Sequence, residues 1–443
     1  MFNNLKNKAS YIWLVVGILW VVSMLNYLDR LMIASMREPI KNSIAMTDAQ
    51  FGLLTTVFLL VYGILSPFGG YFADRYSRKM VIILSLFVWS AVTAWTGFVS
   101  SYTEMLIARS VMGISEACYI PAAVAMVMDY HKGPTRSLAS GILMSGLYVG
   151  MALGGTGGYI AEYWGWRVGF RLFGIIGIAY AVFLFFILRD HPKTSRMIVE
   201  TNENARINLF EIIHNLFRSG SYRIIILYGA LLGMTFWFIY AWLPTYFKEG
   251  FHLSLGQAGV SATAFIQIAS LIGVITGGIL ADRRARKNVK GRIWITAVGF
   301  MVGGPFLFLM TLTEMFGIAV AGIIIFGLAK GFHDANFMPI ICQVVDKRYQ
   351  ATGYGLMSFF SVIVGGLMIY VGGALKDANI SISIVFQISA IGVFIAGMIL
   401  LAIHPKRDGL TNDDEYETLL LSLPKDDKSE FIPYQSENGL NKK

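Results

Sequence analysis

The chain contains the stretch GGYFADRYSRK at residues 69–79, and the pattern returns as GGILADRRARK at residues 277–287, with seven positions identical at the same spacing. A second, weaker repeat follows in each half: Arg136, Ala139 and Gly141 correspond to Arg348, Ala351 and Gly353. The two halves of the chain therefore repeat each other. Parallel repeats of this kind place a solute site between the halves, near the middle of a bilayer.

Twelve long hydrophobic runs flank and contain these motifs. Hydrophobic residues make up 56% of the chain and charged residues 14%, whereas a soluble domain carries about a quarter charged residues. A bilayer core of about 30 Å needs roughly 20 apolar residues in a helix. The runs lie near 11–36, 49–72, 80–99, 102–129, 137–161, 168–188, 223–247, 257–281, 292–312, 315–340, 351–375 and 382–403. We predict an all-α membrane protein with about twelve transmembrane helices in two pseudo-symmetric six-helix bundles.

The polar gap between the sixth and seventh runs divides the chain. We expect bundles at 1–188 and 223–404, a cytoplasmic linker at 189–222 and a disordered cytoplasmic tail at 405–443. Within the linker, the amphipathic stretch 207–217 is suited to lie along a membrane surface.

Basic residues mark the orientation of the helices. Every second gap between the runs is rich in Lys and Arg, and the alternate gaps hold few. The positive-inside rule then puts both termini and the linker in the cytoplasm, so we expect a multi-pass protein of the inner (plasma) membrane.

Several other classes of protein are excluded by composition. The formal net charge of +9 is spread over short gaps between hydrophobic runs, so nucleic acid is not an expected partner. No zinc or redox spacing surrounds Cys118 and Cys342, and we expect neither metal nor cofactor. The first run is too long for a cleavable signal peptide. The lipid bilayer is the expected environment, and a monomer the expected state.

The pattern G-G-x-x-A-D-R-x-x-R-K resembles the loop motif of the major facilitator superfamily, and the likeness spans about 390 residues, from the first helix to the last. In that family, the acid and bases form a cytoplasmic latch that holds the outward-facing state. Positive-inside anchoring alone would account for the arginines but not for a repeated Asp. The resemblance implies a latch made of Asp74, Arg75 and Arg78, with Asp282, Arg283 and Arg286 as its counterpart.

A narrower resemblance lies in helices one, four and seven. NYLDR at 26–30, RSVMGISEA at 109–117 and WLPTYF at 242–247 are similar to motifs of the anion:cation symporter family, which includes galactonate, hexuronate, glutamate and sialic acid transporters. In the second half, GFHDAN at 331–336 and ATGYG at 351–355 are closer to Spinster-type transporters. This departure leaves the substrate open.

Two adjacent charges lie past the middle of the first helix. Asp29 and Arg30 either snorkel or form a local ion pair, or they face a cavity, because charge near the bilayer centre is costly. In the functional interpretation, Arg30 binds the negative charge of the substrate with its planar fork, and Asp29 carries a proton.

The fourth helix contributes a second acid and base. Arg109 and Glu116 are seven residues apart and share one helix face. Arg109 serves either the fold or the substrate. Loss of water favours the protonated form of a carboxyl group, so we predict Glu116 as a second proton-coupling acid; a neutral, hydrogen-bonded Glu is the alternative.

The tenth helix carries Lys330, His333, Asp334 and Asn336 within an apolar run. Lys330 and Asp334, at i and i+4, either neutralise each other or bind substrate. We include His333, with a possible relay role, and Asn336 among the candidate substrate-binding residues.

Aromatic and amide side chains complete the candidate cavity. Tyr62, Tyr148, Tyr240 and Gln267 are predicted to line it, although aromatic residues in membrane helices more often serve packing. Tyr62 also matches a helix-two tyrosine of the anion:cation symporter family.

The predicted function is proton-coupled symport of a small organic anion, a sugar acid such as an aldonate, a hexuronate or a sialic acid. A Spinster-like carrier of lysolipids is the first alternative, and would need a laterally open apolar groove. A membrane-embedded enzyme is another, but no nucleophile–base pair, metal cluster or phosphate-binding loop is present at usable spacing, so no catalytic residue is assigned. A receptor would need a signalling domain.

Overall fold

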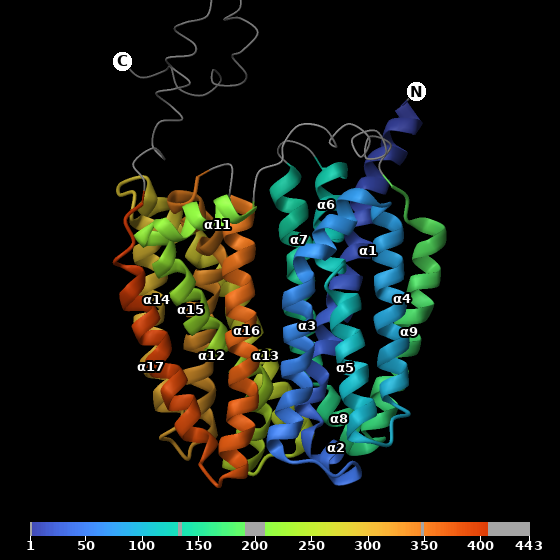
Figure 1. Ribbon diagram of the computed structural model, residues 1–443, viewed down its shortest axis with the longest axis vertical. Coiled ribbons are helices and arrows are strands. Elements are labelled where there is room, and N and C mark those ends of the chain that lie inside the picture. Colours follow the sequence, from blue (N-terminus) through green and yellow to red (C-terminus); the bar gives the residue numbers. More distant parts are fainter. Residues whose placement is uncertain (1, 132–134, 191–208, 347–349, 406–443) are drawn as a thin grey trace, which may run out of the picture.

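A computed structural model describes residues 2–131, 135–190, 209–346 and 350–405. These residues form helices and loops, with no strand among them, and twelve of the helical spans are long and apolar enough to cross a membrane. The predicted fold class is confirmed. Figure 1 shows the helices gathered in two bundles that stand side by side.

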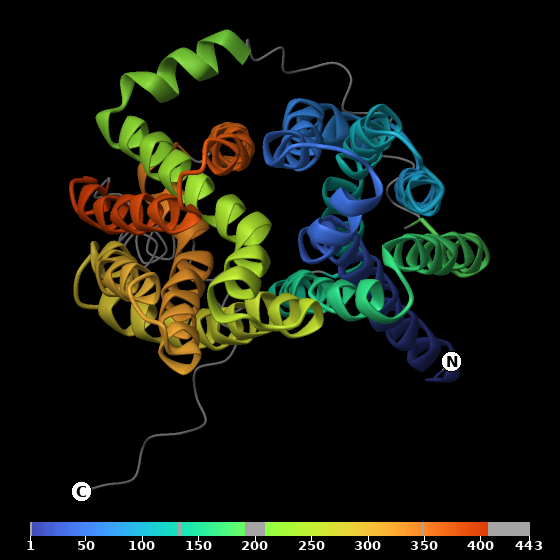
Figure 2. The same ribbon diagram turned by 90° about the horizontal axis from the view of Figure 1, so that it is seen from below.

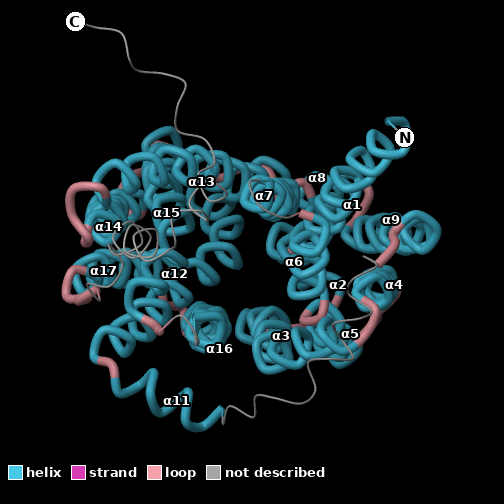
Figure 3. The backbone as a smooth tube through the Cα atoms, turned by 90° about the horizontal axis from the view of Figure 1, so that it is seen from above, coloured by secondary structure: helices cyan, strands magenta, loops and turns pink. Residues whose placement is uncertain are grey.

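The N-terminal bundle comprises α1 (Phe2–Ser35), α2 (Arg37–Ser43), α3 (Asp48–Arg75), α4 (Arg78–Thr96), α5 (Tyr102–Glu116), α6 (Tyr119–Tyr130), α7 (Arg136–Gly154), α8 (Gly157–Tyr163) and α9 (Trp166–Ile187). The C-terminal bundle comprises α12 (Gly220–Phe251), α13 (Leu255–Ala285), α14 (Gly291–Met310), α15 (Phe316–Val344), α16 (Gln350–Asp377) and α17 (Ile382–Leu400). The helix α11 (Leu209–Arg218) covers most of the predicted amphipathic stretch and runs across the outside of the C-terminal bundle (Figure 3). Much of the predicted linker, 191–208, and nearly all of the predicted tail, 406–443, lie outside the described residues.

Two of the twelve spans are interrupted. The fourth consists of α5 and α6, because Pro121 has no amide hydrogen to bond to the carbonyl of Ala117. The fifth consists of α7 and α8, which meet at the sequence GGTGG of residues 154–158, where four glycines weaken the helix. The first interruption directly follows Glu116, which is the last residue of α5.

The repeated motif has a packing role in both bundles. A Cβ on Gly69 would lie 2.3 Å from the carbonyl oxygen of Ala117, and a Cβ on Gly277 would lie 2.8 Å from the Cα of Phe332. Each glycine thus lets the second span of its bundle approach the fourth. Small residues permit this close backbone approach between membrane helices.

The two bundles touch along two seams at the end of the molecule that carries α2 and α8, here called the closed end. One seam joins α7 and α8 to α13, and the other joins α3 to α16, as the views along the bundles show (Figures 2 and 3). At the opposite end, here called the open end, the bundles diverge (Figure 1). The open end carries both copies of the repeated motif.

Glycines make the first seam tight. A Cβ on Gly155 would lie 2.2 Å from the carbonyl oxygen of Gly259. One turn further along α13, the hydroxyl of Thr263 donates to the carbonyl of Ala152 at 2.9 Å. The helices α7 and α13 therefore run antiparallel across this seam with a fixed register.

A carboxylate closes the second seam. Asp377, at the end of α16, accepts hydrogen bonds from the backbone amides of Asp48 (2.8 Å) and Ala49 (2.7 Å) in the first turn of α3. Deeper in the seam, the Thr56 hydroxyl donates to the carbonyl of Gly366 at 2.5 Å. The C-terminal bundle thus caps a helix of the N-terminal bundle.

Ion pairs cross the rim of the closed end. Arg37 lies 3.4 Å from Glu249, and Glu38 pairs with Lys248. Pairs at an exposed rim contribute about 1 kcal/mol or less each. The close glycine contacts and the helix cap therefore matter more for holding this end together.

We expect Gly155→Ala to weaken the closed end, because its methyl group has no room beside Gly259. A cysteine at Ser35, which is buried at this seam, would then react several-fold faster with a membrane-impermeant thiol reagent in a background lacking Cys118 and Cys342. The control is Gly250→Ala, where a Cβ meets nothing within 4 Å. Equal labelling rates in both variants would contradict the packing argument.

Candidate functional site

A buried ion pair lies within the N-terminal bundle. The Nη2 of Arg30 on α1 donates to the Oε2 of Glu116 on α5 at 2.7 Å, and its Nε donates to the same oxygen at 3.3 Å. The side chains are 1% and 0% exposed. Asn26, one turn before Arg30, accepts from Nη2 at 3.4 Å. Arg30, the predicted anion-binding residue, is therefore paired with Glu116, one of the predicted proton-coupling residues.

Three aromatic rings enclose the guanidinium group. Its central carbon lies 4.5 Å from the ring centroid of Tyr27, 4.6 Å from that of Tyr62 and 4.9 Å from that of Phe58. Such contacts stabilise a cation that has lost its water. The sequence analysis named Tyr62 but missed Tyr27 and Phe58; the position of Tyr27, three residues before Arg30 on one helix, was the available signal.

Two further predicted charged residues of this bundle, Asp29 and Arg109, are also buried. Asp29 turns to α4, where its Oδ2 accepts from the hydroxyl of Thr93 at 3.3 Å, and its Oδ1 is buried without a hydrogen-bond partner among the described residues. Arg109 lies with its guanidinium 5.8 Å from the ring of Phe58 and its Nη1 3.2 Å from the sulfur of Met112. Phe58 thus contacts both arginines.

The C-terminal bundle carries its own charge pair. On α15, the Nζ of Lys330 lies 2.5 Å from the Oδ2 of Asp334. The hydroxyl of Tyr148, from α7 of the opposite bundle, donates to the same oxygen at 2.8 Å, and its ring centroid lies 5.0 Å from Nζ. The neutralisation of Lys330 by Asp334 is observed, and a residue of the other bundle takes part in it.

Two predicted tenth-helix residues are held inside the bundle. His333 shares a hydrogen bond of 2.7 Å with the hydroxyl of Tyr228 and packs against the ring of Phe337 at 4.7 Å between centroids. The amide of Asn336 donates to the carbonyl of Phe332 at 2.9 Å, and Asn336 is fully buried. These contacts give both residues a packing role and bring neither of them to the Arg30 pair.

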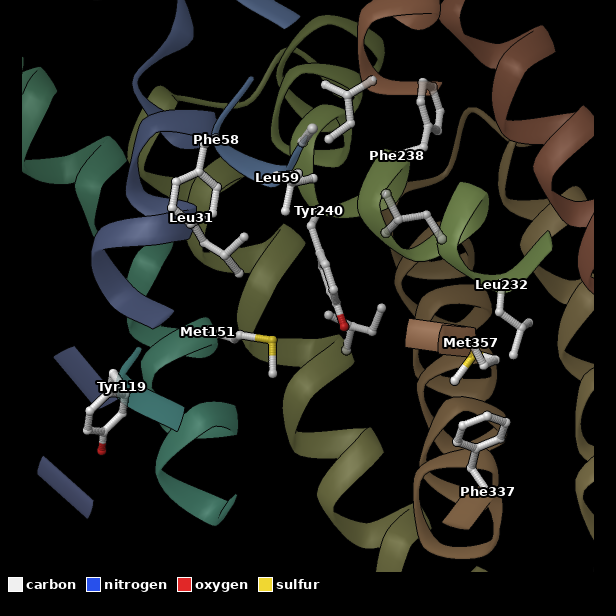
Figure 4. Packing of buried hydrophobic residues seen from close by; sticks show 14 of the residues in the cluster. Leu31, Phe58, Leu59, Tyr119, Met151, Leu232, Phe238, Tyr240, Phe337 and Met357 are labelled. Carbon is white, nitrogen blue, oxygen red and sulfur yellow. The ribbon is translucent and has the colours of Figure 1, made fainter. Parts of the chain in front are cut away.

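The remaining candidates, Tyr240 on α12 and Gln267 on α13, are both buried. Figure 4 shows the Tyr240 side chain projecting from α12 between Met151 of the N-terminal bundle and Met357 of the C-terminal bundle. The Tyr240 hydroxyl and both amide atoms of Gln267 are buried without a hydrogen bond of normal geometry among the described residues, although the hydroxyl lies near both Gln267 and Lys330. The structure therefore brings Tyr62 to Arg30 within the N-terminal bundle and places Tyr148 and Tyr240 at the boundary between the bundles.

Comparisons with known proteins agree with this architecture. The sequence model of the Major Facilitator Superfamily matches residues 19–369. The chain belongs to the Major Facilitator Superfamily. It is a transporter of that superfamily, which is not an enzymatic family.

The chain is similar to several known proteins over most of its length. The chain is 24% identical over 422 residues to a probable sulfoacetate transporter of Cupriavidus necator, covering 90% of this chain and 96% of that protein. It is 26% identical to the protein spinster of Drosophila melanogaster, covering 83% and 62%. It is 24% identical to a probable L-galactonate transporter of Escherichia coli, covering 82% of each.

Solved structures share the superfamily fold. A bacterial homologue of the human lysosomal transporter Spinster, in an inward-facing and unoccupied conformation, superposes with a TM-score of 0.72 at 20% identity, covering 90% of this chain and 99% of that one. A point mutant of the nucleoside transporter NupG gives a TM-score of 0.70 at 14% identity, covering 88% and 99%.

The described contacts of the residues predicted to form the superfamily latch lie within each bundle. Arg78 pairs with Asp129 and donates to the carbonyl of Ala125 at 2.8 Å, within the N-terminal bundle. Asp282 pairs with Arg292 at 2.5 Å, within the C-terminal bundle. The side chains of Arg75, Arg283 and Arg286 are exposed, and that of Asp74 lies outside what the structure describes. The latch role of these six residues stays a prediction.

Glu116→Ala should destabilise this superfamily member, because it leaves Arg30 buried without its carboxylate. Removal of one partner of a buried ion pair costs about 3–5 kcal/mol. Thermal unfolding of the purified protein in detergent should show a clear drop in midpoint, and a smaller one for Glu116→Gln, whose amide oxygen still accepts a hydrogen bond. Glu314→Ala, at an exposed loop position, is the control. A midpoint equal to that of the control would show that the pair adds no stability.

Proposed function

We propose that this transporter is a proton-coupled symporter of a small organic anion, a sugar acid such as an aldonate, a hexuronate or a sialic acid, and that it works by alternating access. The single observation that supports this best is the Arg30–Glu116 pair, in which a carboxylate of the protein holds the group that an anionic substrate needs. Two relatives are named as a probable sulfoacetate transporter and a probable L-galactonate transporter, and both of these solutes are organic anions.

The proposed coupling follows from competition for Arg30. A guanidinium group binds a carboxylate through two parallel hydrogen bonds and keeps its charge. When Glu116 is ionised, it occupies that group; when Glu116 takes a proton, it releases Arg30 to the substrate. The binding of proton and anion is thereby linked, and each strengthens the other. Asp29, buried beside α4 with one oxygen unpartnered, is the second proposed proton carrier.

The proposed orientation puts the open end in the cytoplasm. The basic copies of the repeated motif lie there, as the positive-inside rule requires of short loops. Both termini would then be cytoplasmic, in the inner (plasma) membrane. In this orientation the structure represents an inward-open state, in which the seams at the closed end block access from the external side of the membrane. We expect the protein to act as a monomer.

The anion proposal is tested at Arg30. Arg30→Lys keeps the charge but loses the planar fork, so the affinity for a sugar acid such as D-gluconate should fall. Arg30→Ala should abolish binding. Equilibrium binding to purified, correctly folded variants is the measurement. Wild-type affinity in Arg30→Ala would give the arginine a structural role and reopen the class of substrate.

Coupling is tested at Glu116 and Asp29. Glu116→Gln imitates the protonated acid, so it should retain substrate binding and counterflow exchange but lose accumulation driven by a proton gradient, since return of the empty carrier requires deprotonation. Asp29→Asn should behave similarly or bind more weakly. Both transport modes are measured in the same proteoliposomes. Accumulation at the wild-type level in both variants would leave a facilitator or a sodium-coupled carrier.

A second candidate, transport of an amphipath, is favoured by the aromatic wall of the C-terminal bundle. The rings of Phe236, Phe300 and Phe337 surround His333, with their centroids 4.7–6.0 Å from that of its ring. The similarity to the protein spinster covers 83% of this chain. Competition separates the two candidates. A lysophospholipid that displaces D-gluconate, and is itself carried into vesicles, would favour the amphipath.

A further inference from the structure

A cavity of about 250 Å³ lies at the closed end, between the two bundles. Residues of both bundles line it: Arg37, Glu38 and Lys41 come from α2, which Figure 1 labels at this end, and Lys248 and Glu249 come from the end of α12. None of the described residues assigned above to the solute or the proton belongs to this lining. The cavity therefore has its present form only while the bundles are joined here.

Arg37 has a donor that none of its described neighbours uses. Its Nη1 donates to Glu249 at 3.4 Å and its Nη2 donates to Asp48, so both terminal nitrogens are engaged. Its Nε is buried and has no hydrogen-bond partner among the described residues, and the whole residue is 9% exposed. An unmade hydrogen bond of a buried charged group is costly. Arg37 can therefore offer one further N–H group to a molecule in the cavity.

Two ammonium groups add spare donors. The Nζ of Lys41 lies 2.5 Å from the Oδ1 of Asp48, and Lys248 pairs with Glu38 across the rim. Each of these amines makes one hydrogen bond among the described residues, although an ammonium group carries three N–H donors. Asp48, which Arg37 shares, is not itself part of the lining. The lining therefore has more donors than its own acceptors use.

Burial separates the bases of the lining from its acids. The side chains of Arg37 and Lys41 are 11% and 22% exposed, and that of Lys248 is 31% exposed. The acids Glu38 and Glu249 are 47% and 44% exposed, so they keep more of their water. A charge that has lost water is stabilised by an opposite charge that bonds to it. The less hydrated groups are the bases, and the cavity therefore favours an anion over a cation.

We propose that this cavity binds a small oxyanion between Arg37 and Lys41 of the N-terminal bundle and Lys248 of the C-terminal bundle. An oxyanion only accepts hydrogen bonds and carries several oxygen atoms, which suits several donors around one space. One water molecule occupies about 30 Å³ in the liquid, so the cavity has room for sulfate or for a short carboxylate. The site goes beyond the proposed transport function, because it involves neither Arg30 nor Glu116.

The bound anion also stabilises the joined arrangement of the closed end. Its ligands belong to both bundles, so movement that parts the bundles separates Arg37 from Lys248 and removes the site. A ligand favours the arrangement that it binds more tightly, and by the same linkage, opening of this end releases the anion. With the open end in the cytoplasm, as proposed above, oxyanions on the external side slow the change to the outward-open state.

Binding is tested with labelled sulfate and the purified protein, by equilibrium dialysis at constant ionic strength. Lys41→Gln and Lys248→Gln each remove one charged donor, so each should weaken sulfate binding about tenfold. The matched control is Lys376→Gln, which should leave sulfate binding unchanged. Lys376 is as exposed as Lys41, at 21% against 22%, and its Nζ also lies 2.5 Å from a carboxylate, that of Glu249, but it does not line the cavity.

Competition identifies the source of the oxyanion. Displacement of labelled sulfate by acetate as well as by phosphate would show that the site takes carboxylates, and therefore organic anions. Displacement by phosphate alone would restrict the site to inorganic oxyanions. Chloride at the same concentration should displace little sulfate, because a single atom cannot meet several separated donors at once.

The effect on the closed end is tested with a cysteine at Thr56, which is buried in the second seam and does not line the cavity, in a background lacking Cys118 and Cys342. The rate of labelling by a thiol reagent reports how often this seam opens. At ten times its dissociation constant, sulfate should slow labelling about tenfold. The same concentration should slow labelling only about twofold when Lys41→Gln is also present.

Four results would overturn the proposal: no saturable sulfate binding by the wild type, equal weakening in Lys41→Gln and Lys376→Gln, displacement by chloride as effective as that by phosphate, or an unchanged labelling rate in the sulfate-bound protein. Thermal midpoints measured in chloride check that each variant is folded. Lys248→Gln, compared with the same control, decides the question if Lys41→Gln does not fold.

Discussion

A guanidinium group that loses its water inside a membrane must find replacement contacts within the protein. Arg30 finds them in Glu116 and in three aromatic rings. A lone charge near the bilayer centre costs at least about 2.5–3.5 kcal/mol, so the N-terminal bundle is organised to keep this pair together. The close approach of α3 to α5 and α6, permitted by Gly113 and Gly69, brings the rings of Phe58 and Tyr62 against the arginine.

The two bundles repeat each other in helix order but differ in how they hold charge. In the N-terminal bundle, base and acid come from different helices and are sealed from solvent. In the C-terminal bundle, Lys330 and Asp334 come from one helix, and the acid is reached both by solvent and by Tyr148 of the other bundle. One pair is therefore sealed inside its own bundle, and the other faces the opposite bundle.

The twelve-helix fold could be predicted from the sequence because its signals are local. Twelve apolar runs, the spacing of the repeated motif and the shared face of Arg109 and Glu116 are visible within short stretches of the chain. The contacts of the site are not local. Arg30 and Glu116 are 86 residues apart, and Tyr148 and Asp334 are 186 apart; only the packing of the helices decides that they meet. For the same reason, the helix period could not tell that Asn336 faces the packed interior, or that Asp29 contacts Thr93.

The capping of α3 by Asp377 has a consequence for hydration. The first amides of a helix have no partner within their own helix, and at the closed end two of them depend on a carboxylate that belongs to the opposite bundle. Any movement that parts the bundles there leaves both amides and the carboxylate to be solvated. The seam therefore cannot separate without water entering it. The free-energy difference between the joined and the separated arrangement of this end then includes the hydration of the first turn of α3. The activity of water then becomes a variable on which the balance between the two arrangements depends.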